Sequence, residues 1–348
     1  MTTSNADLAE LLTRAAGTQE GNKRRALRRA GHAALTWEEE ASAVAQSGDE
    51  LTALRGVGPW IADFITALLA DPPELPEPPP QRRGFATLAA GRRLLANRRE
   101  WRSDLLGDLQ MHTTYSDGHL TIDEMANECA ARGYSYIAIT DHSKGLRIAG
   151  GMDEARLESQ AADIERVNAS LADEGEGLRV LRGIEMNLDP AGDGDMEADA
   201  LEGLDIVLGS FHSQLRITDD QTERYIAGLR NPHVSVLGHP RCRMWDRRVG
   251  LRADWERVFA VAAELDKAVE TDAHANRQDI DTHLLEVARD AGVRISIGTD
   301  AHDGNELAHV DIGLAAALRA GVPKERILNF MPADELVAWS KSVRARQP

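Results

Sequence analysis

The hydrophobic pattern of residues 105–348 consists of seven short apolar runs that each end in imidazole or carboxylate side chains. The runs cover residues 105–112, 136–142, 178–185, 204–212, 234–240, 268–272 and 293–302. Segments with apolar residues at helical spacing, such as 154–172 and 253–265, separate them. Strands that alternate with helices favour a parallel sheet, and polar residues at their carboxyl ends are typical of a barrel mouth. We therefore expect an α/β fold with a seven-stranded (β/α)7 barrel.

The beginning of the chain shows a purely helical pattern. Residues 7–16 have apolar residues at helical spacing, 23–30 are densely basic, and 37–46 form a third expected helix. Residues 72–80 are rich in proline and favour an extended, semi-rigid linker, and the Ala- and Leu-rich segment 81–102 carries paired arginines. The expected parts are a small all-α domain at 1–71, a linker with a basic helix at 72–104, and the barrel at 105–348.

Residues 51–65 have the pattern of a helical hairpin. A helix is expected to end near Arg55, Gly56 and Gly58 make a tight turn, and a second helix begins. Glycines at a helix N-terminus let backbone N–H groups face outward, where they can hold a phosphate. An ordinary hairpin that packs on itself is the alternative, but the basic helix before it favours binding to DNA. The expected DNA-binding residues are Gly56, Gly58, Lys23, Arg24 and Arg28.

The net charge of −17 is unevenly distributed. Residues 1–107 carry 14 basic and 14 acidic side chains, so the rest of the chain carries the whole excess. An acidic barrel is a poor sequence-independent binder of nucleic acid. The chain has two cysteines, no signal-peptide pattern at Met1 and no apolar run long enough to span a membrane. We therefore expect a cytoplasmic protein with no membrane partner.

The polar residues at the strand ends form a ligand set for metal ions. They are His112, His142, His212, His239 and His302, together with Asp117, Glu185 and Asp300. Imidazole nitrogens and carboxylate oxygens suit Zn²⁺, Mn²⁺ or Fe²⁺. The chain has no serine-nucleophile elbow and no phosphate-binding lysine loop, so metal-assisted hydrolysis is the simplest chemistry.

The spacing of these residues resembles the motifs of the PHP (polymerase and histidinol phosphatase) domain. The matching segments are Gln110-Met111-His112, Ser116-Asp117-Gly118, Thr140-Asp141-His142, Gly183-Ile184-Glu185, Phe211-His212, Gly238-His239-Pro240 and Asp300-Ala301-His302. The resemblance implies a distorted barrel with two to three divalent metals, and Glu185 as a ligand that bridges two of them. The implied ligands are Gln110, His112, Asp117, His142, Glu185, His212, His239, Asp300 and His302. Asp141 and His302 are the candidates for proton transfer.

Gln110 is the main departure from the PHP pattern, because most PHP domains have the first histidine of His-x-His there. A glutamine carbonyl is a weaker and harder ligand, so we expect lower occupancy or a shift from Zn²⁺ towards Mn²⁺. PHP domains attached to bacterial family X DNA polymerases also have glutamine at this position. The segment from Glu270 to His274, with Arg277 and Asp279, resembles the same subgroup.

Residues 5–71 resemble the N-terminal DNA-end-binding domain of family X polymerases. The helix after the hairpin has no lysine to form a Schiff base, so we expect no lyase activity. The 33 residues of segment 72–104 are too few for a palm and thumb, so we expect no polymerase activity either.

Four arginines follow the fifth strand, and they either hold substrate phosphates or form ordinary surface charge. The expected substrate-binding residues are Arg241, Arg247, Arg248 and Arg277. The favoured hypothesis is a metal-dependent phosphodiesterase that acts on DNA ends in repair, as a 3′–5′ exonuclease or end-processing enzyme. A phosphatase of a small phosphomonoester such as histidinol phosphate is the alternative. A non-catalytic DNA-binding accessory protein is a third hypothesis, which only Gln110 supports.

Overall fold

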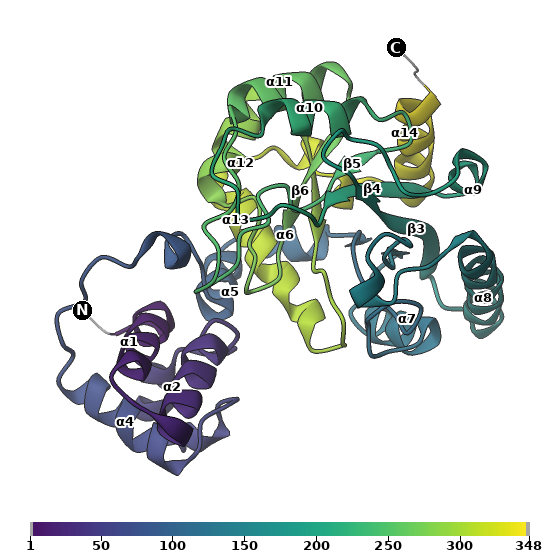
Figure 1. Cartoon of the computed structure of the whole chain (residues 1–348). Coiled ribbons are helices and arrows are strands. Elements are labelled where there is room, and N and C mark those ends of the chain that lie inside the picture. The colour runs from purple at the N-terminus through teal and green to yellow at the C-terminus, as the bar shows by residue number, and fades with distance from the viewer. Residues whose placement is uncertain (1–2, 346–348) are drawn as a thin grey trace.

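The computed structural model describes residues 3–345, and its centre is a sheet of seven parallel strands in sequence order. The strands are β1 (Gly107–Asp108), β2 (Tyr136–Ile139), β3 (Arg179–Leu188), β4 (Ile206–Phe211), β5 (Val236–Leu237), β6 (Ala268–Asp272) and β7 (Arg294–Gly298). Each strand pairs in parallel with the next one along the chain. The predicted seven-stranded barrel is confirmed (Figure 1).

The barrel closes between β7 and β1 through only a few contacts. At the mouth, His112 N donates to Ala301 O at 2.9 Å and Asp300 N donates to Gln110 O at 3.0 Å. Below these contacts, the side-chain amide of the buried Asn329 donates to Gly107 O at 2.9 Å and to Ile297 O at 2.8 Å. A side-chain amide therefore replaces part of the backbone ladder, and the barrel is nearly closed.

Helices surround the barrel and cover the outward faces of its strands. They are α7 (Ile122–Ala130), α8 (Glu154–Glu174), α9 (Ala198–Glu202), α10 (Thr222–Arg230), α11 (Trp255–Glu264), α12 (Thr282–Ala291) and α13 (Val310–Ala320). The last helix, α14 (Ala333–Ala345), covers the amino-terminal end of the barrel instead. Its Ser340 hydroxyl lies 2.7 Å from that of Ser235, which precedes β5. The opposite end, where the strands finish, is left for the site. Within residues 3–345, no helix is long and apolar enough to cross a membrane.

The N-terminal helices form their own bundle. They are α1 (Asn5–Gly17), α2 (Gly21–Ala33), α3 (Ala41–Ser47), the 3₁₀ turn η1 (Leu51–Ala53) and α4 (Pro59–Ala70). Gly48 has a φ of +85° and ends α3, so the helix expected before the hairpin glycines is a single 3₁₀ turn. The turn itself occurs as expected, because Gly56 has a φ of +78° and α4 follows Gly58 directly.

The apolar core of this bundle continues into the barrel. The linker carries η2 (Pro80–Arg82), α5 (Leu88–Ala96) and α6 (Glu100–Ser103). Leu88, together with Trp245, Ala275 and Ile312 of the barrel, packs into the same cluster as the helices of the bundle. The bundle is therefore packed against the barrel as well as connected through the linker.

Arg82 is the polar centre of this contact between bundle and barrel. Its guanidinium lies 2.6 Å from Glu10 of α1 and 2.6 Å from Asp246 of the barrel. Glu10 is 2% exposed, so its carboxylate has lost most of its contact with water. The ion pair with Arg82 offsets the free-energy cost of that loss. Beside it, Ala86 and Gln278 exchange two hydrogen bonds of 2.8 Å.

Replacement of Arg82 should weaken the contact between bundle and barrel. Arg82→Ala leaves Glu10 and Asp246 with fewer partners, and we expect a loss of about 1–3 kcal/mol in the free energy of unfolding. Arg83→Ala is the matched control, because Arg83 pairs with Glu77 across 3.2 Å at an exposed site. Urea denaturation measures both, and equal stability of the two variants would contradict the role of Arg82.

Candidate metal centre

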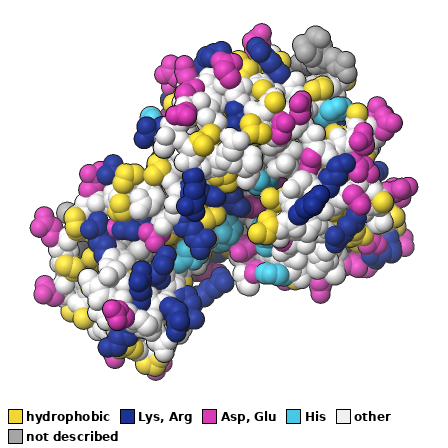
Figure 2. Space-filling view, viewed as in Figure 1, with side chains coloured by type: hydrophobic (Ala, Val, Ile, Leu, Met, Phe, Trp, Pro, Cys, Tyr) yellow, Lys and Arg dark blue, Asp and Glu magenta, His cyan; other side chains and the backbone are white. Residues whose placement is uncertain are grey.

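The side chains predicted as metal ligands meet at the carboxyl ends of the strands. His112, His142, His212 and His239 follow β1, β2, β4 and β5, and Glu185 lies within β3. Asp300 and His302 follow β7, so they meet His112 where the barrel closes. Figure 2 shows histidine side chains in the hollow where the bundle meets the barrel.

The ligand atoms fall into three overlapping groups. In each group, one atom per residue lies within 4.8 Å of every other. The groups are His112, Asp117, His142 and His302; His142, Glu185 and His212; and His112, Glu185 and Asp300. The groups share His112, His142 and Glu185, as expected for metals held close together. The number of groups is compatible with two to three ions.

Glu185 is the centre of these groups. Its Oε1 lies 2.6 Å from His239 Nε2 and 3.3 Å from His212 Nε2, and its Oε2 lies 2.9 Å from His142 Nδ1. Burial by itself raises the pKa of this carboxyl, but the charges of the three imidazoles outweigh burial and hold the pKa well below its usual range. Glu185 is thus a permanent anion in a buried site, as a bridging ligand needs to be.

The hydrogen bonding of the centre fits a bound metal. Within residues 3–345, four of its buried atoms form no well-aligned hydrogen bond, although some of them lie within 3.3 Å of one another: His112 Nδ1, His142 Nδ1, Glu185 Oε2 and His212 Nε2. Buried polar atoms without partners are costly, and metal coordination is one way to satisfy imidazole and carboxylate atoms. The donor set therefore fits divalent metals.

Gln110 takes a different position from the surrounding histidines. It is fully buried, and with its amide nitrogen turned towards Glu270 it donates to both oxygens of that carboxylate. Glu270 also accepts from the backbone N–H of His239 at 2.7 Å, and burial raises its pKa to about 8. Only the carbonyl oxygen of Gln110 is then left for a metal, and its predicted role as a ligand stays a prediction. Glu270 therefore orients both Gln110 and His239. The sequence motifs did not identify Glu270 as a site residue.

Asp141 lies beneath the loop that carries Asp117. Its carboxylate accepts hydrogen bonds from Thr113 N at 2.7 Å, Thr113 Oγ1 at 2.6 Å and Gln160 Nε2 at 2.7 Å, and another from Ser116 Oγ. These contacts are those of a residue that positions the loop. Asp141 is therefore engaged in positioning this loop, and the role of His302, which is 24% exposed, in proton transfer stays a prediction.

The predicted arginines occupy three separate places. Arg241 lies 2.7 Å from Asp281 and is held by this carboxylate. Arg277 lies 2.9 Å from Asp300 and 3.4 Å from Asp272, beside the metal ligands. Arg247 lines a cavity between the bundle and the barrel.

Arg248 faces Arg277 and a further arginine, Arg216, that sequence analysis missed. Burial lowers the pKa of Arg248, and the positive charges of Arg277 and Arg216 lower it further. Arg277 is already paired with Asp300 and Asp272, so Arg248 and Arg216 are the cations that could attract an anion here. Arg216 follows His212 by four residues, and this position in the loop after β4 was the available signal.

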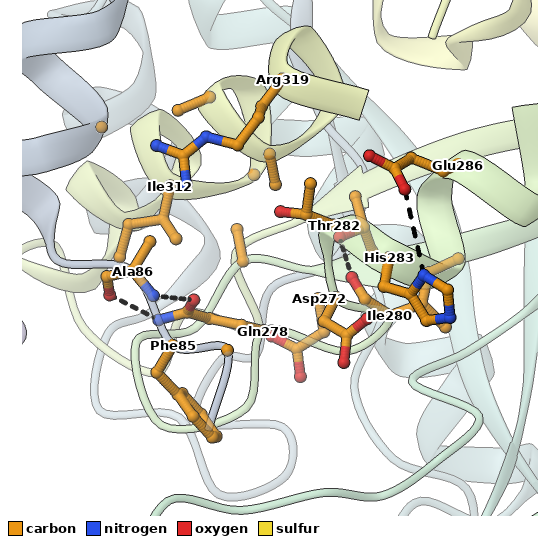
Figure 3. Close-up of a pocket in the computed structure, with 18 residues that line it drawn as sticks. Phe85, Ala86, Asp272, Gln278, Ile280, Thr282, His283, Glu286, Ile312 and Arg319 are labelled. Carbon is orange, nitrogen blue, oxygen red and sulfur yellow. Dashed lines mark hydrogen bonds and ion pairs between the residues drawn. The ribbon is translucent and has the colours of Figure 1, made fainter. Parts of the chain in front are cut away.

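A second cavity, of about 430 Å³, lies outside the barrel and is drawn in Figure 3. Phe85, Ile280 and Ile312 give it apolar walls, and Gln278 reaches across to the backbone of Ala86. None of the predicted metal ligands lines it. This cavity is therefore separate from the metal centre.

Metal affinity should depend on pH through His302. Burial lowers the pKa of His302, but the hydrogen bond with Asp117 and the charge of Asp300 outweigh burial and raise the pKa to about 10. A ligating imidazole is neutral, so metal binding must release this proton below that pH, and affinity should rise with pH.

Calorimetric titration with Mn²⁺ in buffers of different ionisation enthalpy counts the released protons. His302→Gln should release about one proton fewer than the unsubstituted protein at pH 7.5. His283→Gln is the control, since His283 is 82% exposed on α12. An unchanged proton count in His302→Gln would show that His302 binds no metal.

Comparisons with known proteins agree with this geometry. The sequence profile of the PHP domain matches residues 108–299. The DNA polymerase/3′-5′ exonuclease PolX of Bacillus subtilis is 37% identical over 236 residues, which are 68% of this chain and 41% of that protein. A probable phosphatase of Acetivibrio thermocellus is 30% identical over 233 residues, which are 64% of this chain and 90% of that protein.

Among solved structures, a histidinol phosphate phosphatase from Lactococcus lactis, complexed with zinc, L-histidinol and phosphate, aligns with a TM-score of 0.45 and 16% identity. The alignment covers 63% of this chain and 95% of that one. The profile match spans more than half of the chain and contains most of the metal-centre residues. The chain therefore belongs to the PHP domain family and is a metal-dependent phosphoesterase.

Proposed function

We propose that this protein hydrolyses phosphodiester bonds at the 3′ end of DNA, as a 3′–5′ exonuclease or end-processing enzyme. The observation that carries the proposal is the basic face of helix α2, which the bundle presents beside the hollow where it meets the barrel. Lysine and arginine side chains gather on the side of the bundle that borders the histidine-lined hollow (Figure 2). A small-molecule phosphatase has no need of such a surface, because its substrate fits within the centre.

The bundle offers two kinds of contact to a DNA strand. Lys23, Arg24 and Arg28 of α2 are all exposed, and cations at this density attract phosphates. At the hairpin, Gly56 and Gly58 are exposed and no side chain caps α4, so the N–H groups that follow Pro59 in the first turn of this helix are free to bind a phosphate.

Trp60 adds an aromatic surface to the same hairpin. It is 38% exposed, and Lys23 Nζ lies 5.4 Å from the centre of its ring. Exposed aromatic rings beside cations are typical of surfaces on which unpaired bases stack. These features support DNA as the partner of the bundle.

The barrel residues supply the chemistry. Divalent metals bound there would acidify a water molecule and neutralise charge on the phosphoryl group. Glu185 and the histidines hold the reaction centre, and Arg216 and Arg248 hold non-bridging phosphate oxygens. His302, at the exposed rim, would hold a metal there, and the leaving oxygen would take its proton from water at the open mouth. Asp141 keeps the loop of Asp117 in place.

The relatives support two substrates. The relative in Bacillus subtilis is named for a 3′-5′ exonuclease, and the identity of 37% favours DNA. The relative in Acetivibrio thermocellus is named as a probable phosphatase and is matched over 90% of its length, which supports a small phosphomonoester as the second candidate. The exposed cations of α2 support DNA as the first candidate.

The first test compares substrates directly. With Mn²⁺ added, a 5′-labelled DNA strand should shorten stepwise, and histidinol phosphate and p-nitrophenyl phosphate should turn over at least about tenfold more slowly, because the arginines and the bundle add binding energy only for DNA. Gel electrophoresis and phosphate release measure the two reactions. Rapid monoester turnover with intact DNA would reject the proposal in favour of the small-molecule phosphatase.

Glu185→Gln should abolish hydrolysis while the fold persists. The neutral amide cannot bridge metals, and we expect a fall in kcat of about 10³-fold or more, or roughly 4 kcal/mol of transition-state stabilisation. Glu158→Gln, at an exposed position of α8, is the control. Circular dichroism checks the fold, and residual activity near that of the control would exclude Glu185 from the centre.

A further inference from the structure

A cavity of about 480 Å³ lies between helix α2 of the bundle and residues 244–247 of the barrel. Its polar lining comprises Arg28, Arg29, His32, Asp246, Arg247 and Asn276. The volume falls within the range of roughly 300–1,000 Å³ that is typical of ligand pockets. We call it the interdomain pocket.

The interdomain pocket carries an excess of positive charge. Its one carboxylate, Asp246, is already paired with Arg82 at 2.6 Å and with Arg28 at 3.5 Å. Within residues 3–345, the guanidinium groups of Arg29 and Arg247 form no ion pair and no hydrogen bond. Two unneutralised guanidinium groups that face one cavity, in a chain with a net charge of −17, indicate a site for an anion.

The interdomain pocket and the metal centre share one short loop. Asn276 lines the pocket and contacts His32 of α2, and the next residue, Arg277, lies 2.9 Å from Asp300. Adjacent Cα atoms are about 3.8 Å apart, so the two sites border the same short chain segment. A ligand with several anionic groups can therefore occupy both.

The second cavity differs in the charge of its lining. Asp272, Asp281 and Glu286 line it, against the cations Arg319 and His283 (Figure 3). Three carboxylates and one arginine line this cavity, whereas three arginines and one carboxylate line the interdomain pocket. The preference for an anion is thus specific to the interdomain pocket.

We propose that the interdomain pocket binds a backbone phosphate of the DNA strand whose terminal phosphodiester lies at the metal centre. The planar guanidinium groups of Arg29 and Arg247 match the oxygens of a phosphate, and Trp245 and Met244 give the pocket an apolar wall for a sugar. This inference rests on the proposed function and adds a second phosphate site to it.

The fixed position of the bundle makes this second site effective. Arg82 and the shared apolar core hold α2 against the barrel before DNA arrives. Little conformational entropy is then lost when a strand spans both sites. The protein should consequently prefer an oligonucleotide to a phosphodiester that is too small to reach the pocket.

The test compares a single-stranded 12-mer with bis(p-nitrophenyl) phosphate for the unsubstituted protein, Arg29→Ala and Arg29→Ala/Arg247→Ala. The ratio of kcat/KM for the 12-mer to that for the small diester should fall about tenfold in the double variant, mainly through KM, because a ground-state contact is lost. Arg29→Lys keeps the charge and should recover part of the ratio. Arg326→Ala, at an exposed arginine beside the opposite end of the barrel, should leave the ratio unchanged.

Salt dependence gives a second readout that is independent of turnover. Fluorescence anisotropy of the labelled 12-mer, measured across salt concentrations, reports how many phosphates are neutralised. The double variant should lose about 0.7 in the slope of log affinity against log salt, which is the value for one phosphate of a single strand that is no longer neutralised.

The outcomes separate the two proposals. Unchanged ratio and slope in the double variant, with DNA still shortened by the unsubstituted protein, would overturn the second phosphate site and leave the proposed function standing. Monoester turnover without DNA cleavage by the unsubstituted protein would overturn both proposals. A fall in ratio and slope that Arg326→Ala does not share supports the second phosphate site.

Discussion

The negative charge of Glu185, enclosed by imidazoles from β2, β4 and β5, is the constraint on which the centre depends. A carboxylate with no exposed surface is costly to bury, and only surrounding cations or metals offset that cost. The histidines are in turn held close together by this charge. Closure of the barrel serves the same arrangement, since it brings Asp300 and His302 from β7 to His112 of β1.

In the proposed function, the acidic barrel holds the metals and the basic face of α2 binds phosphates of the DNA strand. Most of the net charge of −17 belongs to the barrel, which by itself would repel a nucleic acid. Cations are therefore concentrated at the mouth, through Arg216, Arg248 and Arg277, and on the bundle beside it. Bound metals would add further positive charge at the point of reaction. This separation favours entry of a strand by its end over binding along the barrel surface.

The role of Gln110 in the centre depends on its hydrogen-bond partner. A histidine at this position would bring a ring nitrogen, whereas the amide of glutamine donates to Glu270. Glu270 also accepts from the backbone of His239, so the two strand ends are linked through one buried carboxylate. Gln110 is therefore part of the hydrogen-bond network that surrounds the metal ligands.

The sequence by itself determined the barrel and the identity of the residues at its mouth. Alternating strands and helices have distinct periodicities, and each strand end that carries a histidine or carboxylate is visible in the local pattern. The motif set therefore located Glu185 and the histidines around it. Local patterns also showed the bundle, although the helix expected before Gly56 is only the 3₁₀ turn η1.

Only the tertiary structure decided where the bundle lies and which arginines meet. Arg82 and Asp246 are separated by 164 positions in the chain, and Arg29 and Arg247 face the same cavity from different domains. No periodicity predicts such pairs, because they arise from the packing of Trp245 and Leu88 into the core of the bundle. For the same reason Arg216 appeared as an ordinary loop residue until the fold placed it opposite Arg248. The metal ligands follow from local sequence, whereas the surface that leads to them depends on long-range packing between the bundle and the barrel.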